Sequence, residues 1–266
     1  MKSLEGRVAV ITGAGGGVGR SLSVALARRG VHVALVDIRP DALAETRSLL
    51  TDYGVTVSEH SVDITDKAAM AQLPEQVLAI HGKVNILVNN AGITYQKRFD
   101  NHSIEDWERI VGINWWGTLY SCHFFMEALK ASGAGHIVNM SSMNAFVGLA
   151  SQTSYCATKA AVRLFSESLW AELRQFNIGV TSVHPGAIKT EMMKATLSNA
   201  DDRALAMKTY ALVQKIGVSP DKVANRIITA IVNDKLRIRI GADAVMMDVL
   251  KRCFPVALQR LLARIG

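Results

Sequence analysis

Tyr155 and Lys159 stand four residues apart in the stretch TSYCATKAAV, which reads as a helix. Side chains at this spacing share one face of a helix, so the phenol and the ammonium group would project into the same space. A free tyrosine has a pKa of about 10 and is a weak acid at neutral pH. A neighbouring cation stabilises the phenolate and lowers that pKa, which suits the pair to proton transfer. The same spacing also occurs on solvated helix surfaces, and other residues must decide between these interpretations.

Two serines, Ser141 and Ser142, precede this pair and follow the apolar run HIVNM. A reaction that interconverts an alcohol and a carbonyl group places negative charge on oxygen, so the site needs a hydrogen-bond donor beside that oxygen. Ser142 would hold the oxygen while Tyr155 transfers the proton. The sequence therefore contains the parts of an acid–base site, provided that the fold brings them together.

Short β-branched runs alternate with longer helical patterns along the chain. Nearly continuous apolar strands in such an alternation predict a parallel sheet that is covered by helices on both faces. No long linker, repeat or low-complexity segment interrupts the pattern, so we expect one doubly wound α/β domain over residues 1–266. The strands are predicted at 7–12, 31–37, 55–60, 84–90, 136–142, 179–185 and 237–240.

Two segments depart from this rhythm. Residues 186–212 are rich in Met, Ala and Lys and too long for an ordinary connection, so they are predicted to form a substrate lid. Residues 243–266 form an amphipathic tail, which we expect to pack across a subunit interface or over the substrate pocket. Peripheral contact with an anionic membrane ranks third, because Pro255 interrupts a continuous helix. The apolar positions of the tail are Met246, Val249, Leu250, Cys253, Ala257, Leu261 and Ile265.

The composition excludes several classes of protein. The chain has 266 residues, 49% of them hydrophobic, and a formal net charge of +7. Its 30 Lys and Arg residues are scattered, which favours a generic solvated surface over a nucleic-acid site. The three cysteines lie far apart and match neither a disulfide framework nor a metal site. With no signal-peptide pattern and no apolar stretch long enough to span a bilayer, we expect a cytoplasmic protein without a metal.

The first predicted strand runs into a glycine-rich loop, TGAGGGVGR, and then into a helix. Gly13, Gly17 and Gly19 fit the pattern T-G-x-x-x-G-x-G, whereas neither G-x-G-x-x-G nor a Walker ending is present. Glycines here let the backbone turn tightly and approach a pyrophosphate, which the N-terminus of the helix attracts. The loop therefore predicts a Rossmann-type dinucleotide site.

Asp37 ends the second predicted strand, where an acidic side chain would bind both hydroxyls of an adenosine ribose. A 2′-phosphate at that place would meet a carboxylate, so Asp37 favours NAD over NADP. Arg39 argues the other way, because a nearby arginine can accept the phosphate. Asp63 follows the third strand and either accepts a hydrogen bond from the adenine amino group or caps the next helix.

Further motifs follow in order: NNAG after the fourth strand, GINWWG in the next helix, and PG after the sixth strand. Together with the glycine loop, the serine and the Tyr-x-x-x-Lys pair, they closely resemble the short-chain dehydrogenase/reductase family. The resemblance implies an oxidoreductase in which Asn114 supports a water-linked proton path and Lys159 also binds the nicotinamide ribose. The catalytic candidates are Asn114, Ser142, Tyr155 and Lys159, and the cofactor-binding candidates are Thr12, Gly13, Gly17, Val18, Gly19, Asp37, Asp63, Asn90, Ala91, Gly92, Tyr155, Lys159, Pro185, Gly186, Ile188 and Thr190.

The wall of the substrate pocket is predicted from the segments that follow Asn90, Ser142 and Gly186. Its apolar lining favours an alicyclic, lipid-like or steroid-like secondary alcohol or ketone, although the same Met and Leu side chains could simply pack a lid. The family resemblance also implies a homotetramer or homodimer formed through long helices. The lining candidates are Tyr95, Met143, Asn144, Phe146, Leu149, Gln152, Met192 and Met193, with Val147 and Leu197 beside them.

Other functions compete with an NAD-dependent alcohol dehydrogenase. An NADP-dependent carbonyl or 3-oxoacyl reductase stays open, as does a dinucleotide-sensing protein without catalysis, although the joint presence of Ser142, Tyr155 and Lys159 argues against the latter. A dinucleotide-using epimerase or dehydratase usually resembles longer chains with a separate substrate domain. His184 and Cys156 are interpreted as buried packing groups.

Overall fold

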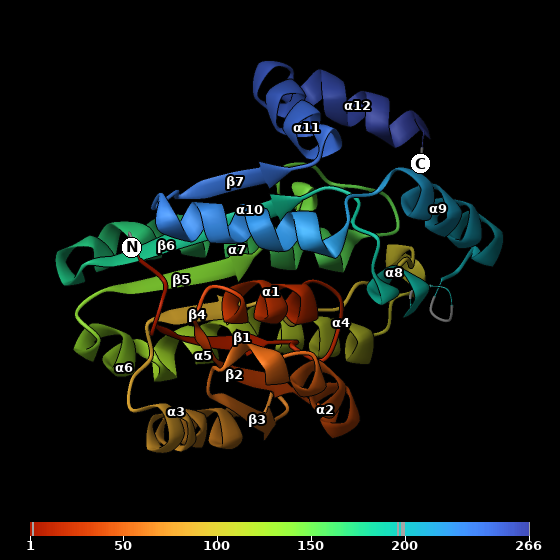
Figure 1. The fold of residues 1–266 in the computed structure, drawn as a ribbon. Coiled ribbons are helices and arrows are strands. Elements are labelled where there is room, and N and C mark those ends of the chain that lie inside the picture. Colours follow the sequence, from red (N-terminus) through yellow and green to blue (C-terminus); the bar gives the residue numbers. More distant parts are fainter. Residues whose placement is uncertain (2, 196, 198–199, 266) are drawn as a thin grey trace.

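Seven parallel strands form one sheet in the order β3-β2-β1-β4-β5-β6-β7 (Figure 1). The structure is a computed structural model that describes residues 1, 3–195, 197 and 200–265. The predicted doubly wound α/β fold is confirmed, and each predicted strand lies within two residues of an observed one. The strands are β1 (Val8–Thr12), β2 (His32–Asp37), β3 (Val57–Ser61), β4 (Ile86–Asn89), β5 (Gly135–Met140), β6 (Ile178–Pro185) and β7 (Arg237–Ile240).

Helices cover both faces of the sheet (Figure 1). The helices are α1 (Gly17–Ala27), α2 (Pro40–Ser48), α3 (Lys67–His81), α4 (Ile104–Val111), α5 (Gly117–Phe124), α6 (Met126–Ala131), α7 (Thr153–Leu173), α8 (Glu191–Ala195), α9 (Arg203–Ile216), α10 (Pro220–Val232), α11 (Ala242–Cys253) and α12 (Pro255–Ile265). Short 3-10 turns lie at η1 (Thr51–Tyr53), η2 (Phe99–Asn101), η4 (Met143–Ala145) and η5 (Arg174–Phe176), and a π-helical turn lies at η3 (Gly112–Trp116).

Alternate strand residues build two cores, one on each face of the sheet. Ala9 and Ile11 of β1 pack in the core that includes α1 and α10. Val10, between them, packs in the opposite core with side chains of α3, α5 and α7. Successive residues of a strand point to opposite faces, so a strand buried on both faces must be apolar throughout. This is why β1 reads VAVIT, with every residue buried.

The carboxyl ends of the strands meet at one edge of the sheet, because all the strands are parallel. Strand order reverses between the neighbouring strands β1 and β4, and open α/β sheets bind their ligands outside the carboxyl ends of the strands at such a point. β1 ends at Thr12, β2 at Asp37, β5 at Met140 and β6 at Pro185, so the residues predicted for the site follow these ends. The topology thus positions the glycine loop and the serine–tyrosine pair on the same edge.

The tail is the second segment that departs from the alternation of strands and helices. Pro255 begins a second helix, so the tail is two helices, α11 and α12, separated at Phe254. Most of the predicted apolar stripe faces outward, with Met246 and Leu261 each 53% exposed, whereas Leu250 packs with Phe146 and Leu258. On the inward face of α11, Asp248 also binds Arg239 of β7 at 2.7 Å. Within the described residues, every helix is too short or too polar to cross a bilayer.

Candidate active site

Tyr155 and Lys159 lie in the first turns of α7, on one face as their spacing predicts. The Lys159 Nζ atom is 5.7 Å from the centre of the Tyr155 ring. Lys159 is buried and donates from Nζ to the carbonyl oxygen of Met140, the last residue of β5, at 2.8 Å. Burial lowers the pKa of Lys159 to about 8, so the amine still carries a proton through most of the neutral range. The pair is therefore anchored to the end of the sheet.

The electrostatics of Tyr155 differ from the sequence-based expectation. Burial raises the pKa of Tyr155, and a hydrogen bond with Ser142 only opposes this effect. The sequence predicts a lowered pKa for Tyr155, because it indicates the neighbouring ammonium group of Lys159. The reason for the difference is that desolvation penalises the phenolate, while the ammonium group is itself partly occupied by the Met140 carbonyl. Tyr155 in the chain by itself is therefore a protonated donor at neutral pH.

Ser142 follows β5 and begins the turn η4. Its Oγ atom accepts a hydrogen bond from the backbone N–H of Asn144 at 3.2 Å. The Ser142 carbonyl lies 3.0 Å from Nδ1 of His184, and a carbonyl can only accept, so Nδ1 of His184 carries the proton. Nε2 of His184 lies 2.9 Å from Ser182, and burial lowers the pKa of His184 to about 4. His184 is thus a neutral, buried group, as predicted, that also fixes the backbone of Ser142.

Asn114 lies in the π-helical turn η3, between α4 and α5. Its Oδ1 atom accepts from the N–H of Ile93 at 2.9 Å, and its Nδ2 atom donates to the Ile93 carbonyl at 2.9 Å. Nδ2 also lies 3.2 Å from the hydroxyl of Thr158 on α7. A π turn widens a helix by one residue and is frequent at functional sites. It joins the segment after NNAG to the helix that carries Tyr155.

Thr12 and Asn90 tie the glycine loop to the end of β4. The Thr12 hydroxyl accepts from the N–H groups of Asn90 and Ala91 at 3.0 and 3.1 Å. Asn90 returns a hydrogen bond from Nδ2 to the carbonyl of Thr12 at 2.9 Å. Gly13 has a φ of +66°, and a Cβ there would lie 2.9 Å from the Cα of Ala91. Gly13 is therefore required for this close approach.

The glycine loop fits a dinucleotide pyrophosphate. Among the described residues, no side chain caps the N-terminus of α1 at Gly16, so its first N–H groups can meet an anion. A Cβ on Gly19 would lie 2.1 Å from the carbonyl oxygen of Gly13, so α1 can begin this close to the loop only with glycine. Gly17 has a φ of +50°, and a Cβ there would lie 3.4 Å from Cγ2 of Thr190. Thr190 thus faces the loop from the segment after β6.

Asp37 lies beside the glycine loop, as predicted. Its Oδ2 atom accepts from the N–H of Gly15 at 3.0 Å. Its Oδ1 atom accepts from the N–H of Arg39 at 3.1 Å and lies 3.4 Å from the Arg39 Nε atom. The carboxylate is held in place at the end of β2, while the Arg39 side chain is 60% exposed. Asp37, which favours NAD, and Arg39, which favours NADP, therefore lie side by side at the end of β2.

Asp63 has a local partner in the structure. Its Oδ1 atom accepts from both the N–H and the hydroxyl of Thr65, at 2.9 and 2.8 Å. Asp66 caps α3 by accepting from Ala68 and Ala69. Asp63 therefore closes the turn before α3 and does not cap the helix, and its contact with adenine stays a prediction.

Asp243 is a residue that sequence reasoning missed. Its Oδ2 atom accepts from the N–H of Ala187 at 2.8 Å. A Cβ on Gly186 would lie only 2.0 Å from the same oxygen, which accounts for the glycine after Pro185. Asp243 belongs to α11 and so links the tail to the segment with Ile188 and Thr190. It lies 57 residues after Gly186 in sequence, so no local spacing could have indicated the contact.

Three segments predicted to line the substrate pocket converge. The N–H of Lys97 donates to the Ser151 carbonyl at 2.9 Å. The N–H of Arg98 donates to Oδ2 of Asp201 at 2.6 Å, and the N–H of Asp201 donates to the carbonyl of Gln96 at 3.2 Å. The loop after β4 is thus bonded both to the segment before α7 and to the start of α9. The pocket walls come together from three parts of the chain.

The lining candidates lie in different environments. Tyr95 is buried against the edge of His102, and Asn144 donates to Gln152. Phe146 stacks on His184 with ring centres 4.5 Å apart and packs with Leu258 of α12, on the side of the tail. Met143 and Leu149 are half-buried, Val147 is buried beside Phe146, Met192 is 37% exposed, and the side chain of Met193 lies outside the described residues.

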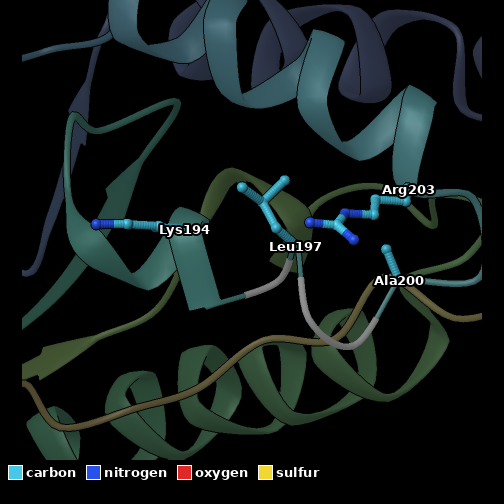
Figure 2. Close-up of a pocket in the computed structure, with 4 residues that line it drawn as sticks. All are labelled: Lys194, Leu197, Ala200 and Arg203. Atoms are coloured by element: carbon cyan, nitrogen blue, oxygen red, sulfur yellow. The ribbon is translucent and has the colours of Figure 1, made fainter.

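A cavity of about 430 Å³ opens between α8 and α9. Of the predicted wall, Leu197 lines it, together with Lys194, Ala200 and Arg203 (Figure 2). The side chain of Arg203 points toward Leu197, whereas Lys194 extends away from it (Figure 2). All four lining residues belong to the segment predicted as a lid, and Ser142 and Tyr155 are not among them.

A family model described as short chain dehydrogenase matches residues 7–201. The chain belongs to the short-chain dehydrogenase/reductase family. It is 36% identical over 267 aligned positions to an oxidoreductase named SadH from Mycobacterium tuberculosis, covering 99% of this chain and 96% of that protein.

Two solved structures of the same family share its fold. A short-chain dehydrogenase/reductase from Burkholderia phymatum in complex with NAD is 27% identical, with a TM-score of 0.89 and 97% of each chain covered. A short-chain dehydrogenase from Mycobacterium paratuberculosis bound to NAD is 27% identical, with a TM-score of 0.78, covering 90% of this chain and 97% of that one. The chain is therefore an oxidoreductase of the type that acts on an alcohol group with NAD or NADP.

Proposed function

We propose that the chain is an NAD-dependent dehydrogenase that interconverts an apolar secondary alcohol and its ketone, with Tyr155 as the acid and base. The observation that carries the proposal is the meeting of Ser142, Tyr155 and Lys159 at the sheet edge that also holds the glycine loop. An alicyclic, lipid-like or steroid-like substrate is expected from the apolar character of the predicted walls.

Four side chains have separate roles in the proposed reaction. When bound, the nicotinamide ring supplies the acceptor or donor for the hydride at the substrate carbon. Ser142 donates a hydrogen bond to the substrate oxygen and holds it beside the Tyr155 hydroxyl. In the reducing direction Tyr155 gives its proton to that oxygen, and in the oxidising direction its phenolate removes the alcohol proton. Lys159 stabilises the phenolate by its charge, and Asn114 supports the water-linked return of the proton.

Proton transfer through Tyr155 makes the rates of the two directions depend on pH. A protonated phenol favours reduction of a ketone, whereas oxidation of an alcohol requires the phenolate. Positive charge beside the phenol, from Lys159 and from an oxidised nicotinamide, lowers the pKa when the site is filled. Oxidation is therefore expected to accelerate as pH rises, and reduction to accelerate as pH falls.

Asp37 supports the choice of NAD. Its carboxylate is fixed by Gly15 and would accept hydrogen bonds from ribose hydroxyls, while repelling a 2′-phosphate. The second candidate, an NADP-dependent carbonyl or 3-oxoacyl reductase, rests on Arg39, whose exposed guanidinium lies at the same place. Asp63, Val18, Ile188 and Thr190 complete the proposed cofactor site with the residues of the glycine loop and the NNAG and PG motifs.

The assembly, lid and location of the enzyme are proposals as well. A homotetramer or homodimer through the long helices is supported by exposed aromatic and aliphatic side chains, Trp116 at 44% and Leu164 at 59%. Residues 186–212 are proposed to act as a lid over the substrate site, and the hydrogen bonds of Asp201 with Arg98 and Gln96, which tie this segment to the loop after β4, support the proposal. A cytoplasmic location is proposed from the cysteines, since Cys122, Cys156 and Cys253 are all free.

A panel of secondary alcohols tests the proposal. Alcohols graded in size and polarity are oxidised with NAD and with NADP, and formation of reduced nicotinamide is followed by absorbance. Turnover of bulky apolar alcohols with NAD is the expected result. Turnover confined to small polar alcohols contradicts the substrate class, and turnover with NADP alone contradicts the preference for NAD.

A further inference from the structure

The outward face of the tail is apolar. We call its six large exposed hydrophobic side chains, which are listed at the end of this paragraph, the tail surface. Val245, Met246 and Val249 share one face of α11, because they are three and four residues apart. The opposite face holds buried Ala244 and the ion-paired Asp248, so an apolar stripe of α11 faces outward while its acidic side chain Asp248 lies inside. The tail surface comprises Val245, Met246, Val249, Phe254, Val256 and Leu261, which are 41%, 53%, 43%, 58%, 60% and 53% exposed.

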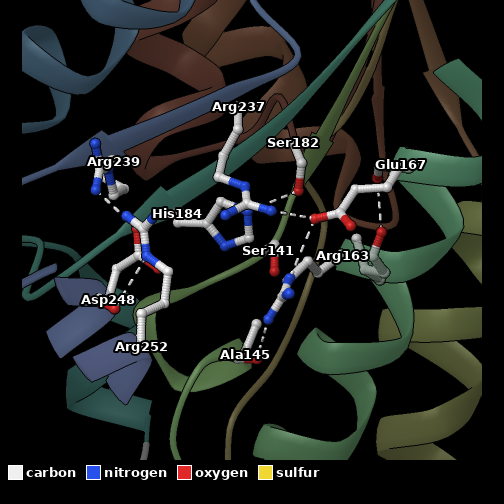
Figure 3. Close-up of polar contacts among 12 residues, drawn as sticks. Ser141, Ala145, Arg163, Glu167, Ser182, His184, Arg237, Arg239, Asp248 and Arg252 are labelled. Atoms are coloured by element: carbon white, nitrogen blue, oxygen red, sulfur yellow. Dashed lines mark hydrogen bonds and ion pairs between the residues drawn. The ribbon is translucent and has the colours of Figure 1, made fainter. Parts of the chain in front are cut away.

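Positive charges flank the tail surface. Arg260 and Arg264 are exposed on α12, and the side chain of Arg252 is 62% exposed at the end of α11. Asp248 is the last acidic residue of the sequence, and it is already bound by both Arg239 and Arg252 (Figure 3). The surface is therefore apolar and cationic at once, and the nearby carboxylate of Asp248 is buried and paired with two arginines.

The helix α9 also combines exposed apolar side chains with positive charge. Leu205, Leu212 and Ile216 are 49%, 54% and 66% exposed, and Lys208 and Lys215 are exposed between them. The sequence of α9 contains no Asp or Glu. Figure 1 places α9, α11 and α12 at the same end of the molecule, away from α3. α9 and the tail, which are far apart in sequence, thus both carry exposed apolar and positively charged side chains and lie at the same end of the molecule (Figure 1).

We propose that the tail surface lies on an anionic lipid bilayer, with α9 beside it. Exposed Val, Met, Phe and Leu side chains would enter the headgroup region, and the arginines would meet anionic headgroups. The Pro255 break does not oppose this, because Pro255 begins α12 and leaves Phe254 exposed at the bend. The two short helices can each lie along a membrane surface without forming one continuous helix.

The charges favour a lipid surface over a second copy of the chain. Two copies packed on this surface about a two-fold axis would share the same patch and face cation to cation. The tail carries no acidic residue after Asp248 that could neutralise Arg252, Arg260 and Arg264 across such an interface. A bilayer with anionic headgroups supplies the missing negative charge.

Sedimentation with lipid vesicles tests the inference. The full chain is spun with vesicles of phosphatidylcholine alone and with vesicles that also contain phosphatidylglycerol. Partition onto the anionic vesicles is expected to be at least about tenfold stronger, and to weaken as salt screens the arginines. No substrate is involved, so the result is independent of the proposed function.

Two double variants test the apolar part and the electrostatic part of the membrane interaction separately. Val249→Asp with Leu261→Asp removes apolar insertion, and Arg260→Glu with Arg264→Glu reverses charge. Each is expected to lower partition at least about tenfold. The matched controls are Ile80→Asp, 54% exposed on α3, and Lys83→Glu just beyond it, which should bind like the parent. Thermal unfolding checks that each variant is folded, and the charge variant keeps the test decisive if the apolar variant is not.

Three results would overturn the inference. One is equal partition of the parent onto both kinds of vesicle, and another is parent-like binding by both double variants. The third is self-association of the parent, measured by light scattering, that Val249→Asp with Leu261→Asp abolishes while anionic vesicles bind neither protein. That result would make a second copy the occupant of the tail surface.

Discussion

Two buried histidines should make the stability of the enzyme fall steeply in mild acid. His136 and His184 are each almost fully buried, and burial lowers the pKa of each to about 4. The unfolded chain binds a proton to each histidine below its ordinary pKa of about 6.5, whereas the folded chain does not. Between these pH values the unfolded state therefore holds more protons, and the free energy of unfolding decreases as pH falls.

The size of the effect follows from the two pKa values. At pH 5, each histidine is expected to reduce the free energy of unfolding by about 2 kcal/mol relative to pH 7.5, and the two together by about 4 kcal/mol. That is a large part of a typical net stability of about 5–15 kcal/mol. Urea unfolding of the full chain at the two pH values measures the total loss, to which His81 also contributes because burial lowers its pKa to about 4.

The variant His136→Gln isolates the contribution of His136 to the loss of unfolding free energy in acid. Gln can still reach the Thr181 hydroxyl, which lies 2.8 Å from Nε2 of His136, but it does not titrate. The loss between pH 7.5 and pH 5 should therefore shrink by about 2 kcal/mol. His123→Gln, at an exposed position of α5, is the control and should leave the loss unchanged. The reasoning is refuted if His136→Gln loses as much stability in acid as the parent does.

Three further predictions concern the site. Asp37→Ala should raise the dissociation constant of NAD by about tenfold or more, through lost hydrogen bonds to the ribose, and narrow or reverse the preference for NAD over NADP; an unchanged preference would point to Arg39 or Arg20 as the determinant. Asp243→Ala should weaken NAD binding by about tenfold, because the 186–190 segment loses its anchor, while Asp243→Asn keeps an acceptor for Ala187 and should restore binding in calorimetry. Equal loss in both variants would contradict a role for that hydrogen bond. Gly19→Ala should abolish NAD binding or folding, since its Cβ would lie 2.1 Å from the Gly13 carbonyl, and wild-type affinity would show that the loop can shift.

The strands and the cofactor loop could be predicted from the sequence because their signals are local. A strand buried on both faces reads as an apolar run, and Gly13 and Gly19 are needed at close approaches within a short segment. Tyr155 and Lys159 share a face by helical spacing alone. These features depend on neighbours that are close in sequence or on the regular geometry of one element.

The features that the sequence did not reveal depend on long-range contacts. Asp248 of α11 binds Arg239 of β7, an ion pair between two elements that no local spacing indicates. Asp243 anchors the segment after β6 through a single hydrogen bond that leaves no periodic pattern. The raised pKa of Tyr155 reflects burial by the assembled fold, whereas the sequence indicates only the neighbouring lysine. The π turn at Asn114 likewise has no counterpart in hydrophobic periodicity.

The central claim is that Tyr155 transfers the proton, and Tyr155→Phe tests it most directly. Removing the hydroxyl takes away the proton donor but little of the surface that binds the cofactor. Turnover of an alcohol that the parent oxidises should fall by a factor of about 10² to 10⁴, while the dissociation constant of NAD, measured by calorimetry, stays within about threefold. Turnover within tenfold of the parent, with NAD bound normally, would contradict the assignment of Tyr155.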